Sequence, residues 1–244
     1  MTPEKVTGLV LSSQNIGETD RRIVLLTKEK GKISAFARGA VRPKNPLVSS
    51  TQPFTFGEYF VYTGRDSYTV TGSEVKNHFS GIIKDLDKYY YASYLCEVAD
   101  YYTRENLIAK SELLLLYQAI RALEKGLLEN ELVRYIFEWR MLYINGEFPE
   151  VFRCIRCGSE EELSGFSVEH HGVVCSRCMS DEVNISKSTI YTLQYIMTSK
   201  LEELFAFTVK SEILEELKML TKKYIADKRH VKFNSEYFLG DMSL

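Results

Sequence analysis

Short apolar and aromatic runs alternate with polar turns through the first eighty residues, which is a pattern typical of β-strands. Runs rich in β-branched and aromatic residues lie at 6–12, 22–27, 32–38, 54–62 and 68–76. Turn residues separate them, with Gly31 before the third run and three prolines before the fourth. Five short strands predict a small barrel of the OB type, which closes its own edges. An SH3-like barrel has a similar strand count and stays an alternative.

From about residue 81 the hydrophobic period changes to that of helices. Five apolar faces are recognisable: Tyr91/Leu95/Val98/Tyr102, Leu113/Leu116/Ile120/Leu123, Leu132/Ile136/Trp139/Tyr143, Ile190/Leu193/Met197 and Ile213/Leu217/Leu220/Tyr224. Gly126 is expected to end the second helix, and Gly146 with Pro149 the third. The sequence therefore predicts an α+β protein with a barrel domain at 1–80 and an all-α domain at 81–244.

Four of the five cysteines form two C-x-x-C pairs, at Cys154/Cys157 and Cys175/Cys178, with seventeen residues between the pairs. Each pair places two thiols on one tight turn, and two such turns give a closed four-thiolate zinc site. Redox dithiols or disulfides are the alternative, but they require an oxidising compartment or a thioredoxin-like context. We expect one structural Zn²⁺ in a module at about 152–180, inserted between helices.

Two adjacent histidines, His170 and His171, precede Gly172 in the stretch that links the two cysteine pairs. One of them can replace a cysteine as a zinc ligand, or both can belong to a turn of a module whose four thiols suffice. The usual ligand count favours the turn.

Charge is distributed unevenly along the chain, although the net charge is only −2. Residues 1–80 contain eleven Lys or Arg and seven acidic residues, whereas the remainder contains twenty and twenty-six. A basic barrel joined to an acidic body suggests that the barrel meets a polyanion. We expect its contacts to include Arg21, Arg22, Arg38, Arg42 and Lys44. Phe36 shares strand parity with Arg38, so it can stack on bases, or it can belong to the barrel core.

Familiar catalytic and targeting signals are missing from the sequence. There is no GxxxxGK[ST], GxGxxG, GxSxG or HExxH motif, which argues against an enzyme. The first residues lack the apolar segment of a signal peptide, and no stretch approaches eighteen apolar residues. We therefore expect a cytoplasmic, nucleoid-associated protein without a membrane span or a catalytic residue.

The order of these parts resembles the bacterial recombination mediator family RecO over nearly the whole chain. The resemblance is carried by residues 16–20, 23–27, 37–40 and 53–54, by Phe137-Glu138-x-Arg140-x-Leu142 leading to Gly146, Pro149 and Cys154-x-x-Cys157-Gly158, and by Lys232-x-x-Ser235-x-x-Phe238-Leu239. The family often has another basic residue directly after its Gly-Ala, where this chain has Val41.

The resemblance implies an N-terminal OB-fold, a helical C-terminal domain and, in many members, an inserted zinc module. It also implies binding of single- and double-stranded DNA, annealing of complementary strands and, with RecR, displacement of single-strand-binding protein (SSB) so that RecA can load. The competing hypothesis is a zinc-stabilised RNA-binding or adaptor protein without annealing activity.

A partner site for the acidic C-terminal tail of SSB is also implied by the resemblance. Such a peptide needs an apolar groove beside one or two fixed cations. The candidate cations are Arg121, Arg134 and Arg140, unless each forms a salt bridge with a neighbour such as Glu131 or Glu138.

Overall fold

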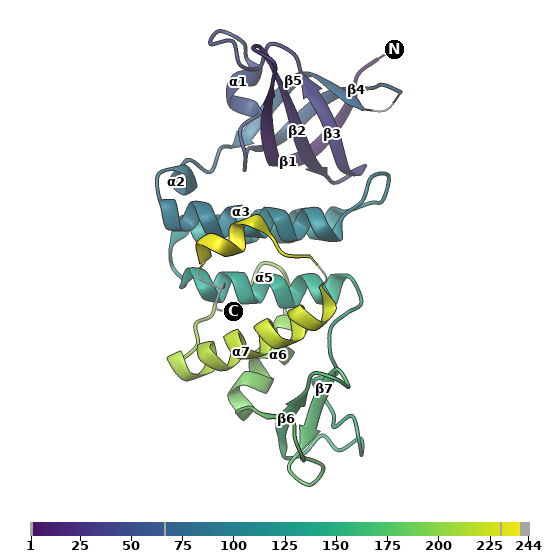
Figure 1. The fold of residues 1–244 in the computed structure, drawn as a ribbon, viewed down its shortest axis with the longest axis vertical. Coiled ribbons are helices and arrows are strands. Elements are labelled where there is room, and N and C mark those ends of the chain that lie inside the picture. The colour runs from purple at the N-terminus through teal and green to yellow at the C-terminus, as the bar shows by residue number, and fades with distance from the viewer. Residues whose placement is uncertain (1, 66, 230, 240–244) are drawn as a thin grey trace. The chain divides into compact units, whose positions relative to one another are not determined.

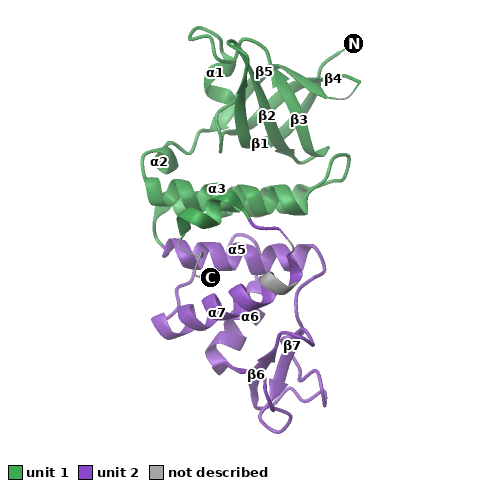
Figure 2. Cartoon of the chain, in the orientation of Figure 1, with its two compact units in different colours: residues 1–127, 233–244 green, residues 128–232 purple. Residues whose placement is uncertain are grey.

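The computed structural model describes residues 2–65, 67–229 and 231–239. The chain divides into two compact units, of which the first contains residues 1–127 and 233–244 and the second residues 128–232 (Figure 2). The first unit thus contains the barrel and some of the helices that follow it. The domain boundary expected at residue 80 stays a prediction.

Five strands form a closed barrel at the start of the first unit (Figure 1). They are β1 (Glu4–Ile16), β2 (Asp20–Thr27), β3 (Gly31–Ala37), β4 (Phe56–Thr63) and β5 (Tyr68–Asn77). Their order is β1-β2-β3-β5-β4, and β1 pairs with β4 to close the barrel. The β3–β5 pair is parallel and all other pairs are antiparallel. This topology confirms the OB-type barrel.

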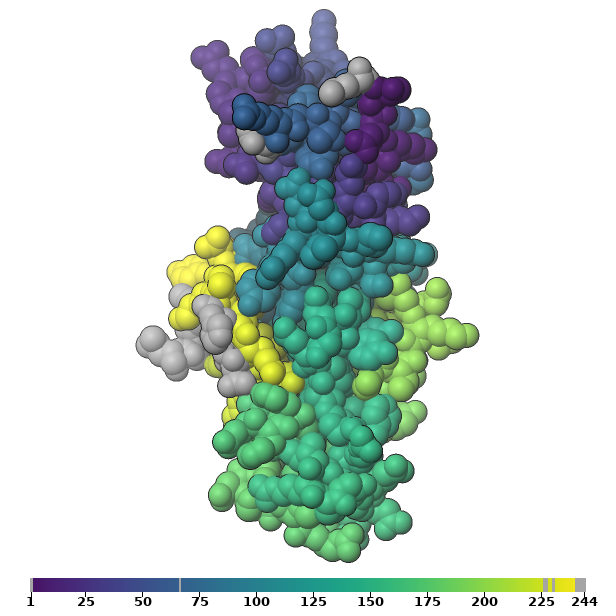
Figure 3. All heavy atoms as spheres, turned by 90° about the vertical axis from the view of Figure 1, so that its right-hand side faces the viewer, coloured from purple at the N-terminus to yellow at the C-terminus, as the bar shows by residue number. Residues whose placement is uncertain are grey.

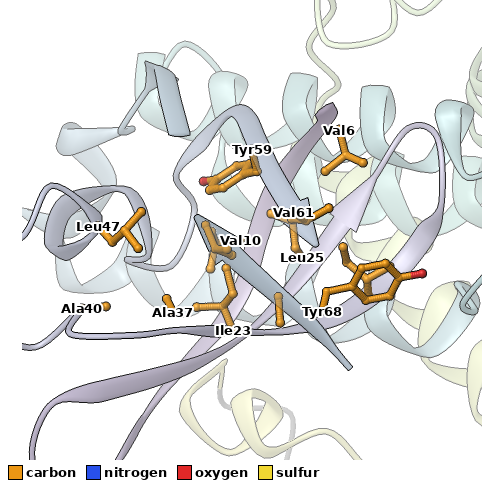
Figure 4. Close-up of a cluster of buried hydrophobic side chains, with 13 residues drawn as sticks. Val6, Val10, Ile23, Leu25, Ala37, Ala40, Leu47, Tyr59, Val61 and Tyr68 are labelled. Atoms are coloured by element: carbon orange, nitrogen blue, oxygen red, sulfur yellow. The ribbon is translucent and has the colours of Figure 1, made fainter. Parts of the chain in front are cut away.

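Inward-facing residues of every strand fill the barrel, and Figure 4 shows this cluster. Because side chains alternate along a strand, each strand contributes every second residue. A short helix, α1 (Leu47–Ser50), adds Leu47 to the same cluster. Tyr59 anchors this region, since its hydroxyl donates to the Ser50 carbonyl at 2.8 Å and to the Thr55 carbonyl at 3.2 Å.

Three helices and a 3₁₀ turn complete the first unit: α2 (Ser80–Ile83), α3 (Leu86–Tyr102), α4 (Lys110–Lys125) and η1 (Asn234–Leu239). The apolar face predicted for α4 is buried, and α4 ends at Gly126 with φ +62°, as expected. The η1 segment, yellow in Figures 1 and 3, packs against α3. There the backbone N–H and the hydroxyl of Ser235 both donate to the Glu97 carboxylate.

The second unit contains α5 (Asn130–Ile144), β6 (Leu163–Ser167), β7 (Gly172–Cys175), β8 (Val183–Asn184), α6 (Lys187–Thr198) and α7 (Ser211–Lys228). Its centre is Trp139, whose indole N–H donates to the Thr221 hydroxyl at 2.9 Å and whose ring stacks on Tyr224 at 5.3 Å. Phe166 of β6 contacts the Tyr224 ring at 5.7 Å, so it joins the three-stranded sheet to the helices.

One expected helix face is wrong in detail. Tyr143 was predicted on the buried face of α5, but 40% of its surface is exposed. Helix α5 is buried on most sides between Leu132 and Leu142, so its buried residues do not follow one stripe. A single stripe therefore does not predict which residue near its end, such as Tyr143, is exposed. Among the described residues no helix has both the length and the apolar character that crossing a membrane requires.

Candidate metal centre and nucleic-acid interface

The two cysteine pairs occupy two tight turns of the second unit. In the first turn the Gly158 N–H donates to the Cys154 carbonyl at 2.8 Å, and Gly158 has φ +76°, which glycine adopts without strain. In the second the Cys178 N–H donates to the Cys175 carbonyl at 3.0 Å, directly after β7. Both turns present their sulfurs to the same point.

The four sulfurs of Cys154, Cys157, Cys175 and Cys178 lie within 4.8 Å of one another. The Sγ atoms of Cys157 and Cys175 are 3.7 Å apart. A tetrahedral ion with bonds of about 2.3 Å to sulfur separates its ligands by roughly 3.8 Å. The cluster therefore has the composition and the size that a four-thiolate metal site requires.

The thiols of the cluster differ in how readily they ionise. Burial opposes ionisation of the Cys154 thiol, but hydrogen bonds from the backbone N–H groups of Cys175, Cys157 and Arg156 outweigh it and lower its pKa to about 6. In contrast, the neighbouring sulfurs of Cys157 and Cys175 raise the pKa of Cys178 to about 12. Four thiolates can coexist at this spacing only if a cation compensates their charge.

Arg156 connects the two turns, a role that the spacing of the cysteines did not indicate. Its guanidinium donates to the Cys178 carbonyl at 2.6 Å and forms an ion pair with Glu182. The histidines lie in the turn between β6 and β7. His171 approaches the Lys228 ammonium at 3.1 Å and packs edge-on against Tyr224, whereas His170 contacts the Ser167 hydroxyl.

The cations predicted on the barrel are placed in two different ways. Arg22, Arg38, Arg42 and Lys44 are exposed. The loop that carries Arg38, Arg42 and Lys44 is fixed to the barrel, because the side chains of Ala40 and Leu47 belong to the barrel core. The Gly39 N–H donates to the Asp20 carboxylate at 2.8 Å. That hydrogen bond, with smaller contributions from Thr19, Arg38 and Arg42, holds the pKa of Asp20 below its usual value.

Arg21 differs from its neighbour Arg22. Its guanidinium is half-buried and donates to the Val48 carbonyl at 2.8 Å and to the Thr51 hydroxyl at 3.1 Å. It therefore ties β2 to the α1 segment. The Nε–H of Arg22 donates to the Ser34 hydroxyl at 2.8 Å on the outer face of the barrel, where the rest of its guanidinium meets solvent.

Phe36 is an outward residue of β3. It is half-exposed and lies between Ala35 and Ala37, both fully buried. The alternative that Phe36 belongs to the barrel core is therefore wrong. The outer face also carries Phe60 and Tyr62 of β4, which the sequence analysis did not single out.

The three arginines considered for partner binding are also placed differently. Arg121 on α4 is exposed. Arg134 is 8% exposed and pairs with Glu138 at 3.4 Å. Arg140 is half-buried, donates to the carbonyl oxygens of Ile196 and Met197, and lies over the Tyr143 ring.

A separate groove of about 640 Å³ lies between α6 and the start of α7. Its apolar lining includes Tyr191, Tyr195 and Phe207, and the last two rings are 4.9 Å apart. Lys187 and Lys210, both exposed, lie in its wall. An apolar floor beside two cations is the chemistry expected for a peptide with acidic residues and an apolar end.

An OB-type barrel with an exposed cationic loop, joined to a unit with a four-cysteine module, is typical of proteins that handle nucleic acids. Comparison with known families agrees. The family model "Recombination protein O N terminal" matches residues 1–79, and "Recombination protein O C terminal" matches residues 83–235.

Individual relatives give the same result. The chain is 34% identical to a DNA repair protein RecO of Acetivibrio thermocellus, with 96% of this chain and 95% of the relative covered. It is 31% identical to the protein of that name in Alkaliphilus metalliredigens, with 95% and 96% covered, and 29% identical to the one in Bacillus subtilis, with 98% and 94% covered. The chain belongs to the RecO family of DNA repair proteins.

The two adjacent arginines generate a prediction about stability. Arg21→Ala should destabilise the barrel by about 1–3 kcal/mol, because the Val48 carbonyl and the Thr51 hydroxyl lose a charged donor. The matched change Arg22→Ala should cost no more than about 0.5–1 kcal/mol, because its contact is exposed. Hydrogen exchange of amides in 45–60 is the suitable measurement, since Trp139 is the single tryptophan and reports on the other unit. Equal protection in the two variants would contradict the structural role of Arg21.

Proposed function

We propose that this protein is a recombination mediator without catalytic turnover. The proposed activities are binding of single- and double-stranded DNA and annealing of complementary strands, together with loading of RecA on SSB-coated DNA in cooperation with RecR. We place it in the cytoplasm, at the nucleoid. Membership of the RecO family supports this proposal, and the exposed cations of the OB-type barrel are the observation that carries it.

The proposed roles are divided between the two expected domains. Residues 1–80 would bind DNA, and residues 81–244 would meet protein partners. Arg22, Arg38, Arg42 and Lys44 are the proposed phosphate contacts. Of the pair Arg21 and Arg22, the exposed Arg22 is the better candidate, because the guanidinium of Arg21 already has two acceptors in the α1 segment.

DNA binding through phosphates makes affinity depend on salt. With about three to five cations engaged, log K should fall against log salt with a slope of roughly −0.7 to −0.9 per contact. Arg38→Ala and Arg42→Ala should each weaken binding about equally for all sequences and reduce that slope by about one. Lys200→Ala, an exposed cation on the second unit, is the matched control and should change neither.

Annealing of complementary strands coated with SSB tests the function itself. We expect acceleration by the protein, a further gain with RecR, and loss of the effect in Arg38→Ala/Arg42→Ala. Salt-independent binding, or annealing that survives the loss of all the barrel cations, would overturn the proposal. Tighter binding to RNA than to DNA without annealing would favour the competing RNA-binding function.

Zinc is the metal that we propose for the four-cysteine cluster. Closed four-thiolate sites are typically structural zinc sites, in which the protein leaves no position for a reactive water. Such a metal contributes on the order of 10–16 kcal/mol to local folding. Cys154→Ser should therefore abolish the one zinc per chain and expose the amides of 150–185 to hydrogen exchange, while the barrel amides keep their protection.

The control for the zinc prediction is Cys96→Ala, which removes the buried cysteine of α3 and should leave the metal content at one per chain. Metal analysis of the purified protein provides the first readout, and hydrogen exchange the second. Four freely titrating thiols in the native protein would rule out the metal site.

For the SSB tail we propose docking on the second unit, at the groove between α6 and α7. Lys187 and Lys210 provide the cations there, whereas Arg134 and Arg140 are engaged in contacts within the protein. Arg121 on α4 is the remaining alternative from the sequence.

The groove and Arg121 can be separated with one peptide. Lys187→Ala/Lys210→Ala should weaken binding of the SSB tail peptide by about tenfold or more, because two charge-assisted contacts are lost. Arg121→Ala should bind normally. The opposite pattern would place the tail at Arg121. Equal binding of a scrambled, equally acidic peptide would exclude specific tail recognition.

A further inference from the structure

Two aromatic side chains share one outward row of the barrel. Phe36 on β3 and Tyr62 on β4 are partly exposed; Phe36 lies between the fully buried Ala35 and Ala37, and Tyr62 follows the fully buried Val61. Since successive side chains of a strand point to opposite faces, both rings project from the outside of the barrel.

Strand register brings the two rings close together. Arg22 pairs with Phe36, Phe36 pairs with Thr69, and Thr69 pairs with Tyr62. The outward row Arg22, Phe36, Thr69 and Tyr62 thus crosses β2, β3, β5 and β4 in that order. Neighbouring strands are about 4.8 Å apart, so Phe36 and Tyr62 are separated by roughly 10 Å with only a threonine between them.

The surroundings of this row suit a polyanion. Outward positions beside it include Val24, Ser34 and Thr71, which carry no charge. The acidic neighbour on β2 is Asp20, whose carboxylate accepts a hydrogen bond from the Gly39 N–H at 2.8 Å. Farther along the outer face of β4, the Glu58 carboxylate is held by Lys5 and Lys76, each at 2.6 Å. Hydrogen bonds from these lysines lower the pKa of Glu58 to about 2, so its charge is permanent but compensated.

Phe60, the third outward aromatic residue of this face, has a different role. It lies opposite Gly72, and a Cβ at Gly72 would meet its ring at 3.5 Å. Its ring thus covers a glycine of β5, an arrangement that stabilises sheets.

We propose that Phe36 and Tyr62 stack on bases of a single strand that crosses β2, β3, β5 and β4, with Arg22 on its phosphates. Bases of a single strand expose their faces to aromatic rings, whereas bases of a duplex are covered by their neighbours. The row therefore makes the barrel bind single-stranded DNA more tightly than duplex. This inference rests on the proposed DNA-binding function and assigns its specificity for strand form.

Removing the rings without removing apolar bulk tests the proposal. Phe36→Leu and Tyr62→Leu should each weaken binding to a single-stranded oligonucleotide by about fivefold or more, in keeping with the usual contribution of one stacked base. Binding to the corresponding duplex should change less than about twofold. Tyr237→Leu, an exposed tyrosine of η1, is the control for loss of a surface ring and should change neither.

An oligonucleotide with abasic sites at its centre separates stacking from phosphate contacts. The wild type should bind it more weakly than the intact strand, and Phe36→Leu should cause no further loss. Phe36→Trp and Tyr62→Phe, which keep an aromatic ring, should bind the intact strand about as tightly as the wild type. The loss in the leucine variants is then due to the missing ring and not to a folding defect.

The outcomes distinguish this inference from the function on which it rests. If the wild type binds the abasic strand and the duplex as tightly as the intact strand, with the expected salt dependence, stacking is wrong and phosphate binding stands. If no DNA binds, or if binding ignores salt, the proposed DNA-binding function fails as well.

Discussion

Successive side chains of a strand point to opposite faces, so closing five strands into a barrel directs every second residue inward and the others outward. Most features of the first unit follow from this constraint. Ala35 and Ala37 fill the interior, so Phe36 between them must face outward. The same alternation separates the adjacent arginines of β2. Arg21 is directed to the α1 segment at the barrel end, while Arg22 reaches the outer face of β3. A surface that can contact DNA is therefore a geometric consequence of the way the core is filled.

The second unit depends on other interactions, because its small three-stranded sheet has little apolar surface of its own to bury. Two interactions hold this sheet in place. Phe166 joins it to Trp139 and Tyr224 on the helices, and the four cysteines bring its two turns to one point, where the proposed metal would fasten them to each other. Arg156 spans those turns, yet its own side chain is exposed and a single salt bridge of that kind contributes little alone. We therefore expect the fold of residues 150–185 to depend most on the proposed metal.

Much of this architecture is predictable from the sequence because it depends on local periodicity. Alternation located the five strands of the barrel, helical spacing located the five long helices, and the C-x-x-C spacing identified the cysteines that converge. The short elements α1, α2 and η1 were missed, because four to six residues contain too little of any period. The register of the strands could not be predicted either, because nothing in the sequence around Phe36 or Tyr62 indicates that Thr69 lies between them. For the same reason the sequence could not separate Arg21 from Arg22, or Arg121 from Arg140.

Charge alone is thus a poor guide to which cations can meet a partner. Arg134 and Arg140 have the same side chain as Arg38 and Arg42, but the first two are committed to a carboxylate or to backbone carbonyls. Withdrawing them would remove a charged donor from those groups in a partly buried place, which costs more than a surface contact returns. Arg38 and Arg42 are exposed on a loop whose backbone is fixed by Ala40, Leu47 and Asp20. Exposed cations on a fixed loop can release one phosphate and bind another with little change in free energy. Such reversible contact is what the proposed annealing activity requires, because each strand must be held and then released to its complement.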